Sequence, residues 1–392
     1  MNRKAVLSSA IIVYFIIGFE ILIMISPFAG LFYSVFTPFL LELVKYPATR
    51  WLCAFYLPHM AVPPDDFLKI IRVIGSVLFV SGLSVFIICA FQVYANKFLK
   101  RGTALKGLYS IIRHPQYIGL ICAGIGLSIL WPRLLTVALW IVMIALYYFL
   151  SKDEERRMLK SYPETYKEYM EKTGMFLPIE IERLVTPSSV IGKILMFILI
   201  ASFTMGSVFF LRDYTIKRLP LWSSPNIAAF ALIVDDKQKM NNRMNDILQM
   251  PEIKTRLKYN EKYLVYFIPV DYIMQGLIAD TGDEWRLYHR HLTLVRFFDW
   301  VIHPFSHLSG THYACQMDMN DNSSMNNGVV RRLIFIEISG IPINTPYDLF
   351  SVNALRTPQF MADVDVHNLK LVDLQDLPHQ DTGWGKLPTP TF

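Results

Sequence analysis

Long apolar runs alternate with short charged segments through the first half of the sequence, and the second half shows no comparable alternation. A run from Ala5 to about Ile25 follows a basic N-terminus, and its apolar character continues to Val44. Ile70 to Tyr94 and Ile191 to Leu211 are each as long as a helix that crosses a bilayer. With a helical hairpin between them, described next, the pattern predicts an α-helical polytopic membrane domain of about five to six transmembrane segments.

The apolar passage from Leu120 to Leu150 is broken only at Trp131-Pro132-Arg133. Proline ends or kinks a helix and arginine seeks water, so the break divides the passage into two arms of about sixteen residues. Both ends of such a hairpin emerge on the same membrane face. Arg113-His114-Pro115 and Glu154-Glu155, which are far apart in sequence, are therefore predicted to be neighbours at one lipid boundary.

The charged segment after the hairpin, residues 152–186, is predicted to be an amphipathic helix against the membrane surface. Tyr162, Tyr166 and Tyr169 follow one another at spacings of four and three, which is typical of one helix face. Residues 45–67 contain four prolines and are predicted to be a loop.

The second half has the pattern of a soluble mixed α/β domain. A β-α-β order is predicted at its start, and a further strand follows later. The three strand-like runs are Ala228–Val234, Tyr263–Val270 and Val329–Ile338, and the helical stretch is Lys237–Met250. We therefore expect three parts: a membrane domain over 1–188, a last transmembrane helix over 189–211, and a soluble domain over 212–392.

Composition and charge agree with an integral membrane protein. The chain is 53% hydrophobic, above the usual share for soluble domains. Residues 1–211 carry 20 Lys and Arg against 12 Asp and Glu, which favours contact with anionic lipid and not with nucleic acid. The basic connection between Lys97 and Arg113 is predicted to be cytoplasmic, and Ile191–Leu211 then carries the soluble domain to the opposite side. We expect the membrane to be a bacterial inner membrane or the endoplasmic reticulum.

The cysteine and histidine patterns do not predict a metal site. The four cysteines are scattered without a Cys-x-x-Cys pair, which argues against a disulfide framework or a thiolate zinc site. Seven of the nine histidines lie in the second half, and His303 and His307 are four residues apart. Without a third ligand at fixed spacing, we assign no metal.

The first polar cluster is suited to an anionic and aromatic ligand. Pro115 is predicted at the first position of a helix, which leaves the N–H groups of residues 116–118 directed outward, where they attract anions. Arg113 offers a planar fork for a carboxylate, and His114 lies near the cap. Tyr117 offers a ring for stacking, and Gly119 permits the close approach of another group.

The second cluster, Glu154 and Glu155, would supply acceptors for hydroxyl or ammonium groups. Together the clusters suit a ligand that is anionic at one end, cationic at another, and aromatic, and S-adenosylmethionine has these features. Each cluster alone is also ordinary at a membrane interface, where charged residues are solvated. Their placement at the two ends of one hairpin favours a site.

The combined motif resembles the superfamily of isoprenylcysteine carboxyl methyltransferases and phospholipid methyltransferases. The resemblance implies an S-adenosylmethionine site at the cytoplasmic face and a lipid or lipidated acceptor that enters from the bilayer. It implies that Arg113, His114 and Glu155 are catalytic. The matching positions are Gly107, Tyr109, Arg113, His114, Pro115, Tyr117, Gly119, Glu154, Glu155, Leu159, Tyr166, Tyr169 and Pro178. The implied cofactor-binding residues are Arg113, His114, Pro115, Tyr117, Gly119, Glu154 and Glu155.

The chain departs from this pattern after Pro178, where family members commonly end. The added helix and the domain over 212–392 leave the acceptor and the partner of that domain open. Two alternatives remain: an NADPH-dependent enzyme similar to sterol reductases, which use a similar hairpin, and a non-enzymatic membrane scaffold whose C-terminal domain binds a partner.

Overall fold

The computed structural model describes residues 39–40, 42–57, 65–99, 106–232, 236–270 and 330–377. The chain divides into two compact units. Residues 67–212 form a helical unit, and residues 1–66 join residues 213–392 in an α/β unit. The anchor helix predicted from Ala5 to Ile25 and the histidines at 303 and 307 lie outside the described residues.

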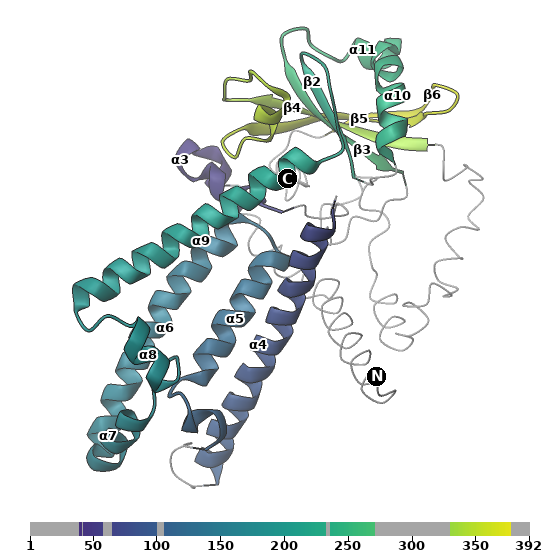
Figure 1. Ribbon diagram of the computed structural model, residues 1–392. Helices are drawn as coiled ribbons and strands as arrows, with labels where there is room; N and C mark the ends of the chain where they lie inside the picture. Colours follow the sequence, from purple (N-terminus) through teal and green to yellow (C-terminus); the bar gives the residue numbers. More distant parts are fainter. Residues whose placement is uncertain are drawn as a thin grey trace, which may run out of the picture. The chain divides into compact units, whose positions relative to one another are not determined.

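The helical unit is built from elongated helices with two shorter ones at one end (Figure 1). In the described part of the chain, α4, α6 and α9 are long and apolar enough to cross a membrane, and α5 is shorter at 16 residues. This agrees with a helical membrane domain and leaves the total number of spans open. The elements are α4 (Asp66–Phe98), η2 (Gly107–Ser110), α5 (Pro115–Leu130), α6 (Leu134–Ser161), α7 (Pro163–Lys172), α8 (Ile179–Val185) and α9 (Val190–Arg218).

The structure contains the predicted hairpin. Helix α5 ends at Leu130 and α6 begins at Leu134, so the turn falls on Trp131-Pro132-Arg133. The second arm is longer than expected, because the charged segment after Leu150 continues α6 to a length of 28 residues. Asp153 pairs with Arg156 and Arg157 on this extension, at spacings that stabilise a helix.

Glycines allow α4 and α5 to pack closely. A Cβ atom placed on Gly119 would lie 2.7 Å from the carbonyl oxygen of Gly82, and one placed on Gly126 would lie 2.3 Å from the backbone nitrogen of Phe79. No side chain fits at these distances, so the two backbones meet directly, as is common between membrane helices. The group that approaches Gly119 is therefore helix α4.

The prediction of one amphipathic helix over residues 152–186 is wrong. Pro163 starts a new helix, α7, and residues 173–178 form a turn before α8. The three tyrosines do not share one environment: Tyr166 is buried, whereas Tyr162 lies at the break and is 51% exposed. The break matters for the site, because it returns the chain to the start of α5.

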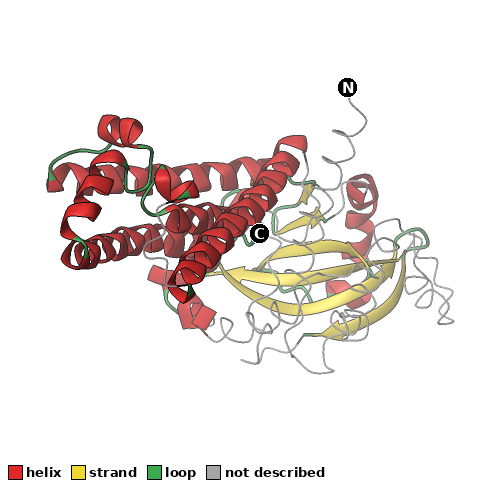
Figure 2. Ribbon diagram, turned by 90° about the horizontal axis from the view of Figure 1, so that it is seen from below, coloured by secondary structure: helices red, strands yellow, loops and turns green. Residues whose placement is uncertain are grey.

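The α/β unit contains a six-stranded sheet in the order β1-β2-β3-β4-β5-β6. Its strands are drawn in yellow in Figure 2. Strands β2 and β3 are parallel and joined through α10 (Asp236–Gln249) and α11 (Pro251–Lys254), which confirms the predicted β-α-β start. The other neighbouring strands are antiparallel. The strands are β1 (Leu221–Ser223), β2 (Ile227–Ala231), β3 (Lys262–Pro269), β4 (Val330–Ser339), β5 (Leu355–Asp365) and β6 (Lys370–Asp376).

The core of this unit lies between the sheet and α10. Met240, Met244 and Ile247 of α10 are fully buried against apolar side chains of the strands. Two buried arginines of β4 each face a carboxylate. Arg331 pairs with Asp236 and Arg332 pairs with Asp363, both through two nitrogen–oxygen contacts.

The described part of the N-terminal segment belongs to the α/β unit. The predicted loop contains two short helices, α3 (Pro47–Arg50) and η1 (Trp51–Cys53). The Arg50 guanidinium donates a hydrogen bond to the carbonyl oxygen of Asn353 at 2.9 Å. Residues 54–57 are buried.

Candidate ligand site at the end of the hairpin

The entry into α5 is fixed by backbone hydrogen bonds to the turn after α7. The Arg113 N–H donates to the Gly174 carbonyl oxygen at 2.8 Å, and the His114 N–H donates to the Met175 carbonyl oxygen at 3.1 Å. His114 caps α5 and Pro115 occupies the first helical position, as predicted. These contacts explain how segments about sixty residues apart in sequence meet at one end of the helical unit.

The Arg113 side chain is enclosed by protein groups. Its Nε lies 2.6 Å from the Oε1 atom of Glu155, and its Nη1 donates to the carbonyl oxygens of Met170, at 3.2 Å, and Thr173. Its side chain is 7% exposed. The Arg113 guanidinium, which was expected to bind a ligand carboxylate, is thus directed at protein groups. It connects α6 to the turn after α7.

His114 lies between the two glutamates. Its Nδ1 is 3.3 Å from the Oε2 atom of Glu154, and its Nε2 is 3.7 Å from the Oε1 atom of Glu155. The ring is buried, and neither nitrogen has a partner in hydrogen-bond geometry among the described residues. Burial lowers the pKa of the imidazole, but the two carboxylates outweigh burial, so the pKa is raised above its usual value.

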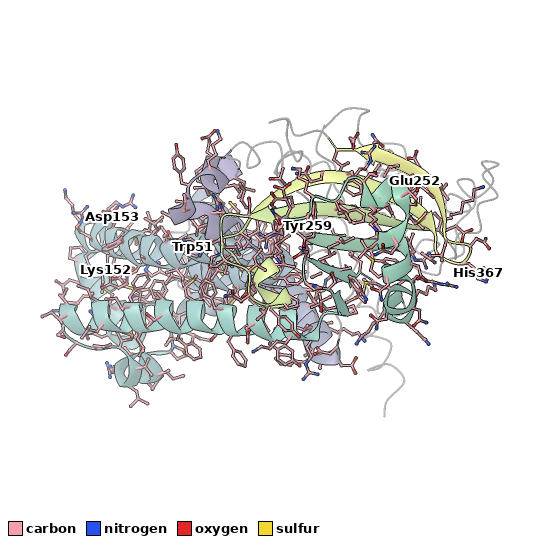
Figure 3. All side chains as sticks on the ribbon, turned by 90° about the horizontal axis from the view of Figure 1, so that it is seen from above. Trp51, Lys152, Asp153, Glu252, Tyr259 and His367 are labelled. Atoms are coloured by element: carbon pink, nitrogen blue, oxygen red, sulfur yellow. The ribbon has the colours of Figure 1, made fainter. Side chains whose placement is uncertain are left out.

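The two glutamates differ in how far their charge is compensated. The Glu155 side chain is 4% exposed and contacts Arg113 and, at 3.1 Å, Lys152. The Glu154 side chain is 36% exposed and accepts a hydrogen bond from the Tyr117 hydroxyl at 2.6 Å. Figure 3 labels Lys152, the residue two positions before Glu154, at one end of the helical unit. Glu154 is therefore the carboxylate more available to a ligand.

Aromatic rings line the same end of the hairpin. Tyr117 stacks on Tyr147 of α6 with ring centroids 4.8 Å apart, and on His114 at 5.7 Å. Phe176, from the turn after α7, lies 6.1 Å from the His114 ring. The partners of Tyr117 in this structure are thus protein rings.

The start of α5 offers fewer free N–H groups than predicted. The N–H groups of Tyr117 and Ile118 already donate to the His114 carbonyl oxygen, at 3.2 and 3.4 Å. Pro115 has no N–H, so the anion attraction expected from three outward N–H groups is reduced to that of Gln116. Gly119 contacts α4, as described above, and Arg113 contacts protein groups.

Sequence reasoning missed the turn formed by residues 173–178. The turn contributes mainly backbone carbonyl groups to the site. Every residue type has such a group, so the sequence gives no signal for it. Glu182 of α8 stabilises this turn, because its Oε2 accepts hydrogen bonds from the N–H groups of Phe176, at 3.0 Å, and Leu177, at 3.3 Å. Gly174 is required there, since a Cβ atom would collide with the Leu177 carbonyl oxygen.

These features define a helical membrane unit with a polar, partly buried site at the end of a hairpin. Residues 70–165 match the model of the phospholipid methyltransferase family. The match confirms, for this segment, the resemblance that the motif indicates. Neither the curated proteins nor the solved structures gave a match to the chain.

The matched segment carries both polar clusters and ends before the turn that completes the site. The chemistry of the site fits a ligand that carries both a positive and a negative group. The buried His114 nitrogens face the two carboxylates at 3.3 and 3.7 Å without good hydrogen-bond geometry in the described part of the chain, and Glu154 offers a partly exposed carboxylate. A buried polar group without a partner is costly, so such groups are expected where a ligand completes the hydrogen bonding.

Proposed function

We propose that the protein is an integral membrane methyltransferase that uses S-adenosylmethionine and acts on a lipid-associated acceptor. The proposed acceptor is an isoprenylcysteine carboxylate or a phospholipid headgroup. The observation that carries the proposal is the meeting of His114 with Glu154 and Glu155, inside a segment that matches the phospholipid methyltransferase family.

In this proposal the residues have different tasks. Glu154 binds the cationic part of the cofactor, because its charge is the less compensated of the two glutamates. His114, whose ring nitrogens lie 3.3 and 3.7 Å from the two glutamates, donates to an anionic or hydroxyl group of the ligand when the ligand is bound. Arg113 and Glu155 position His114 and the turn after α7, and Pro115 fixes the start of α5. Tyr117 orients Glu154 through its hydroxyl, and Gly119 holds α5 against α4.

The cofactor supplies an activated methyl group, so the protein has to hold the acceptor in line and exclude water. An acceptor that is already ionised at neutral pH needs no general base. The raised pKa of His114 favours its protonated form, which donates hydrogen bonds and is a weak base. Of the two acceptors, this supports the carboxylate over the amine of a phospholipid headgroup, which must first lose a proton.

The proposal includes a cytoplasmic position for this site, because the cofactor is made in the cytosol. The basic connection before α5 supports that orientation. The C-terminal domain then lies on the opposite side and binds a partner of its own.

The test is cofactor binding by the full-length protein in detergent. Replacing Glu154 with glutamine keeps the shape of the side chain and removes its charge, so we expect S-adenosylmethionine to bind at least tenfold more weakly, which corresponds to about 1.4 kcal/mol. Asp153→Asn is the matched control, since Asp153 is the adjacent carboxylate and pairs only with surface arginines among the described residues. Its affinity is expected to match the wild type.

Two results would contradict the proposal. Equal affinity in Glu154→Gln and wild type would remove Glu154 from the site. Binding of NADPH by a protein that does not bind S-adenosylmethionine would replace the methyltransferase with a reductase.

A further inference from the structure

Ser151 of α6 is fully buried, and its hydroxyl has no hydrogen-bond partner among the described residues. It is unlike other serines of the helical unit. The hydroxyls of Ser76, Ser84 and Ser128 each donate to the carbonyl oxygen four residues earlier in their own helix. That bond is the usual way for a serine in an apolar helix to satisfy its hydroxyl. Ser151 does not form it, so its hydroxyl is available to another group.

The neighbours of Ser151 on α6 show what it faces. Residues four apart on a helix lie one above the other on the same face. Tyr147, one turn before Ser151, stacks on Tyr117, and Glu155, one turn after it, contacts His114. Ser151 therefore lies on the face of α6 whose neighbouring side chains contact the start of α5.

A second buried atom without a partner lies at the start of α5. The Oε1 atom of Gln116 is buried and has no hydrogen-bond partner in the described part of the chain. Together with the Ser151 hydroxyl, this places buried polar atoms without hydrogen-bond partners in the described part of the chain on both arms of the hairpin. Such a group is expected where a polar ligand supplies the missing partners.

We infer that the Ser151 hydroxyl is a further cofactor contact, which extends the proposed S-adenosylmethionine site one helical turn deeper than the glutamates. One turn of α6 is about 5.4 Å, so Ser151 reaches a part of the ligand nearer the bilayer than Glu154 does. The inference rests on the proposed function. Neither the sequence motif nor the charged clusters point to this residue.

The experiment compares Ser151→Ala and Ser128→Ala in the full-length protein, by titration with S-adenosylmethionine and by thermal unfolding of the ligand-free protein. Ser151→Ala is expected to weaken binding about three- to tenfold, the effect of one neutral hydrogen bond. It is also expected to leave the ligand-free melting temperature unchanged or raised, because it removes a buried hydroxyl without a partner. Ser151→Cys, a weaker donor of similar size, is expected to have an intermediate affinity.

Ser128→Ala is the matched control, since that buried hydroxyl is satisfied within its own helix, and its affinity for the cofactor should equal that of the wild type. A lower melting temperature with unchanged affinity in Ser151→Ala would show that the hydroxyl is structural and would overturn the inference. Unchanged cofactor affinity with a raised KM for the acceptor would also overturn it. A wild-type protein that binds no S-adenosylmethionine would instead overturn the proposed function.

Discussion

Both units bury an arginine against a carboxylate, but they do so in different ways. In the α/β unit, two nitrogens of Arg331 lie 2.8 Å from the two oxygens of Asp236, and two nitrogens of Arg332 lie 2.7 Å from those of Asp363. In the helical unit, Arg113 directs one nitrogen to Glu155 and another to backbone carbonyl oxygens. The first arrangement is bidentate, and the second is shared among several segments.

The difference separates a structural ion pair from a candidate site. The bidentate pairs of β4 satisfy both partners within the sheet unit. Around Arg113 and Glu155, the polar atoms of His114, Gln116 and Ser151 still lack hydrogen-bond partners in the described part of the chain. We therefore treat Arg113 and Glu155 as part of a candidate site, because the groups beside them remain unsatisfied.

The largest expected effect is on the structural pair. Arg331→Ala leaves Asp236 buried with only Lys239, 3.1 Å away, as a cationic partner. Removing one partner of a buried pair costs about 3–5 kcal/mol, so we expect the free energy of unfolding of the α/β unit to fall by that order. The change is measured by denaturant titration of the full-length protein, in which the unfolded fraction of this unit is detected by its susceptibility to proteolysis.

Two further variants make this test specific. The double variant Asp236→Leu with Arg331→Met removes both charges and is expected to recover most of the loss. Arg256→Ala breaks an exposed pair with Asp376, and such pairs contribute about 0–1 kcal/mol. A loss in Arg256→Ala as large as that in Arg331→Ala would contradict the distinction between buried and exposed pairs.

A smaller effect is expected at Gly119. An added methyl group would meet the Gly82 carbonyl oxygen at 2.7 Å and the Phe86 nitrogen at 2.9 Å, so α4 and α5 would have to separate. Overpacking of this kind costs about 1–3 kcal/mol, and we expect Gly119→Ala to lower the melting temperature of the helical unit.

The comparison of stability with cofactor affinity decides the role of Gly119. A packing role predicts that Gly119→Ala lowers the melting temperature more clearly than the affinity for S-adenosylmethionine. Loss of affinity at an unchanged melting temperature would return Gly119 to the cofactor site.

The smallest expected effect is on the pH dependence of stability. The helical unit should lose stability at alkaline pH, and the α/β unit should lose it at acidic pH. His114 has a raised pKa, so its stabilising contribution is complete below its unfolded value of about 6.5 and is lost as the pH rises through the raised value. Burial raises the pKa of Asp236, but Arg331 and Lys239 outweigh burial and lower it. Its contribution is complete above about 3.9 and is lost as the pH falls through the lowered value.

Melting curves of the full-length protein as a function of pH test both signs. His114→Gln should abolish the decline on the alkaline side and leave the acid side unchanged. An alkaline decline that persists in His114→Gln would assign it to another group.

The parts of the fold that were predicted have strong local signals. Trp131-Pro132-Arg133 interrupts an apolar run, and β2, β3 and β4 are apolar runs of strand length. Strand β5 was missed because Pro358 interrupts it, near a shift in its pairing with β4. Strand β6 was missed because it is a polar edge strand, and β1 has only three residues.

Only part of the candidate site has a signal in the sequence. Its charged residues are visible in the sequence, and the hairpin brings them together. The carbonyl oxygens of Thr173, Gly174 and Met175 leave no signal in residue types, and Ser151 is a common residue in an apolar helix. The break at Pro163 was overlooked because the charged segment keeps its helical periodicity across it.

The short sequence span of the site has a consequence for biosynthesis. The contacts of the Arg113 side chain reach to Thr173, so all of its described partners are synthesised before α9 and before the sheet of the α/β unit. Segments of the chain emerge from the ribosome in chain order. The helical site can therefore assemble while the remaining residues are still being translated, so its formation does not wait for the C-terminal domain.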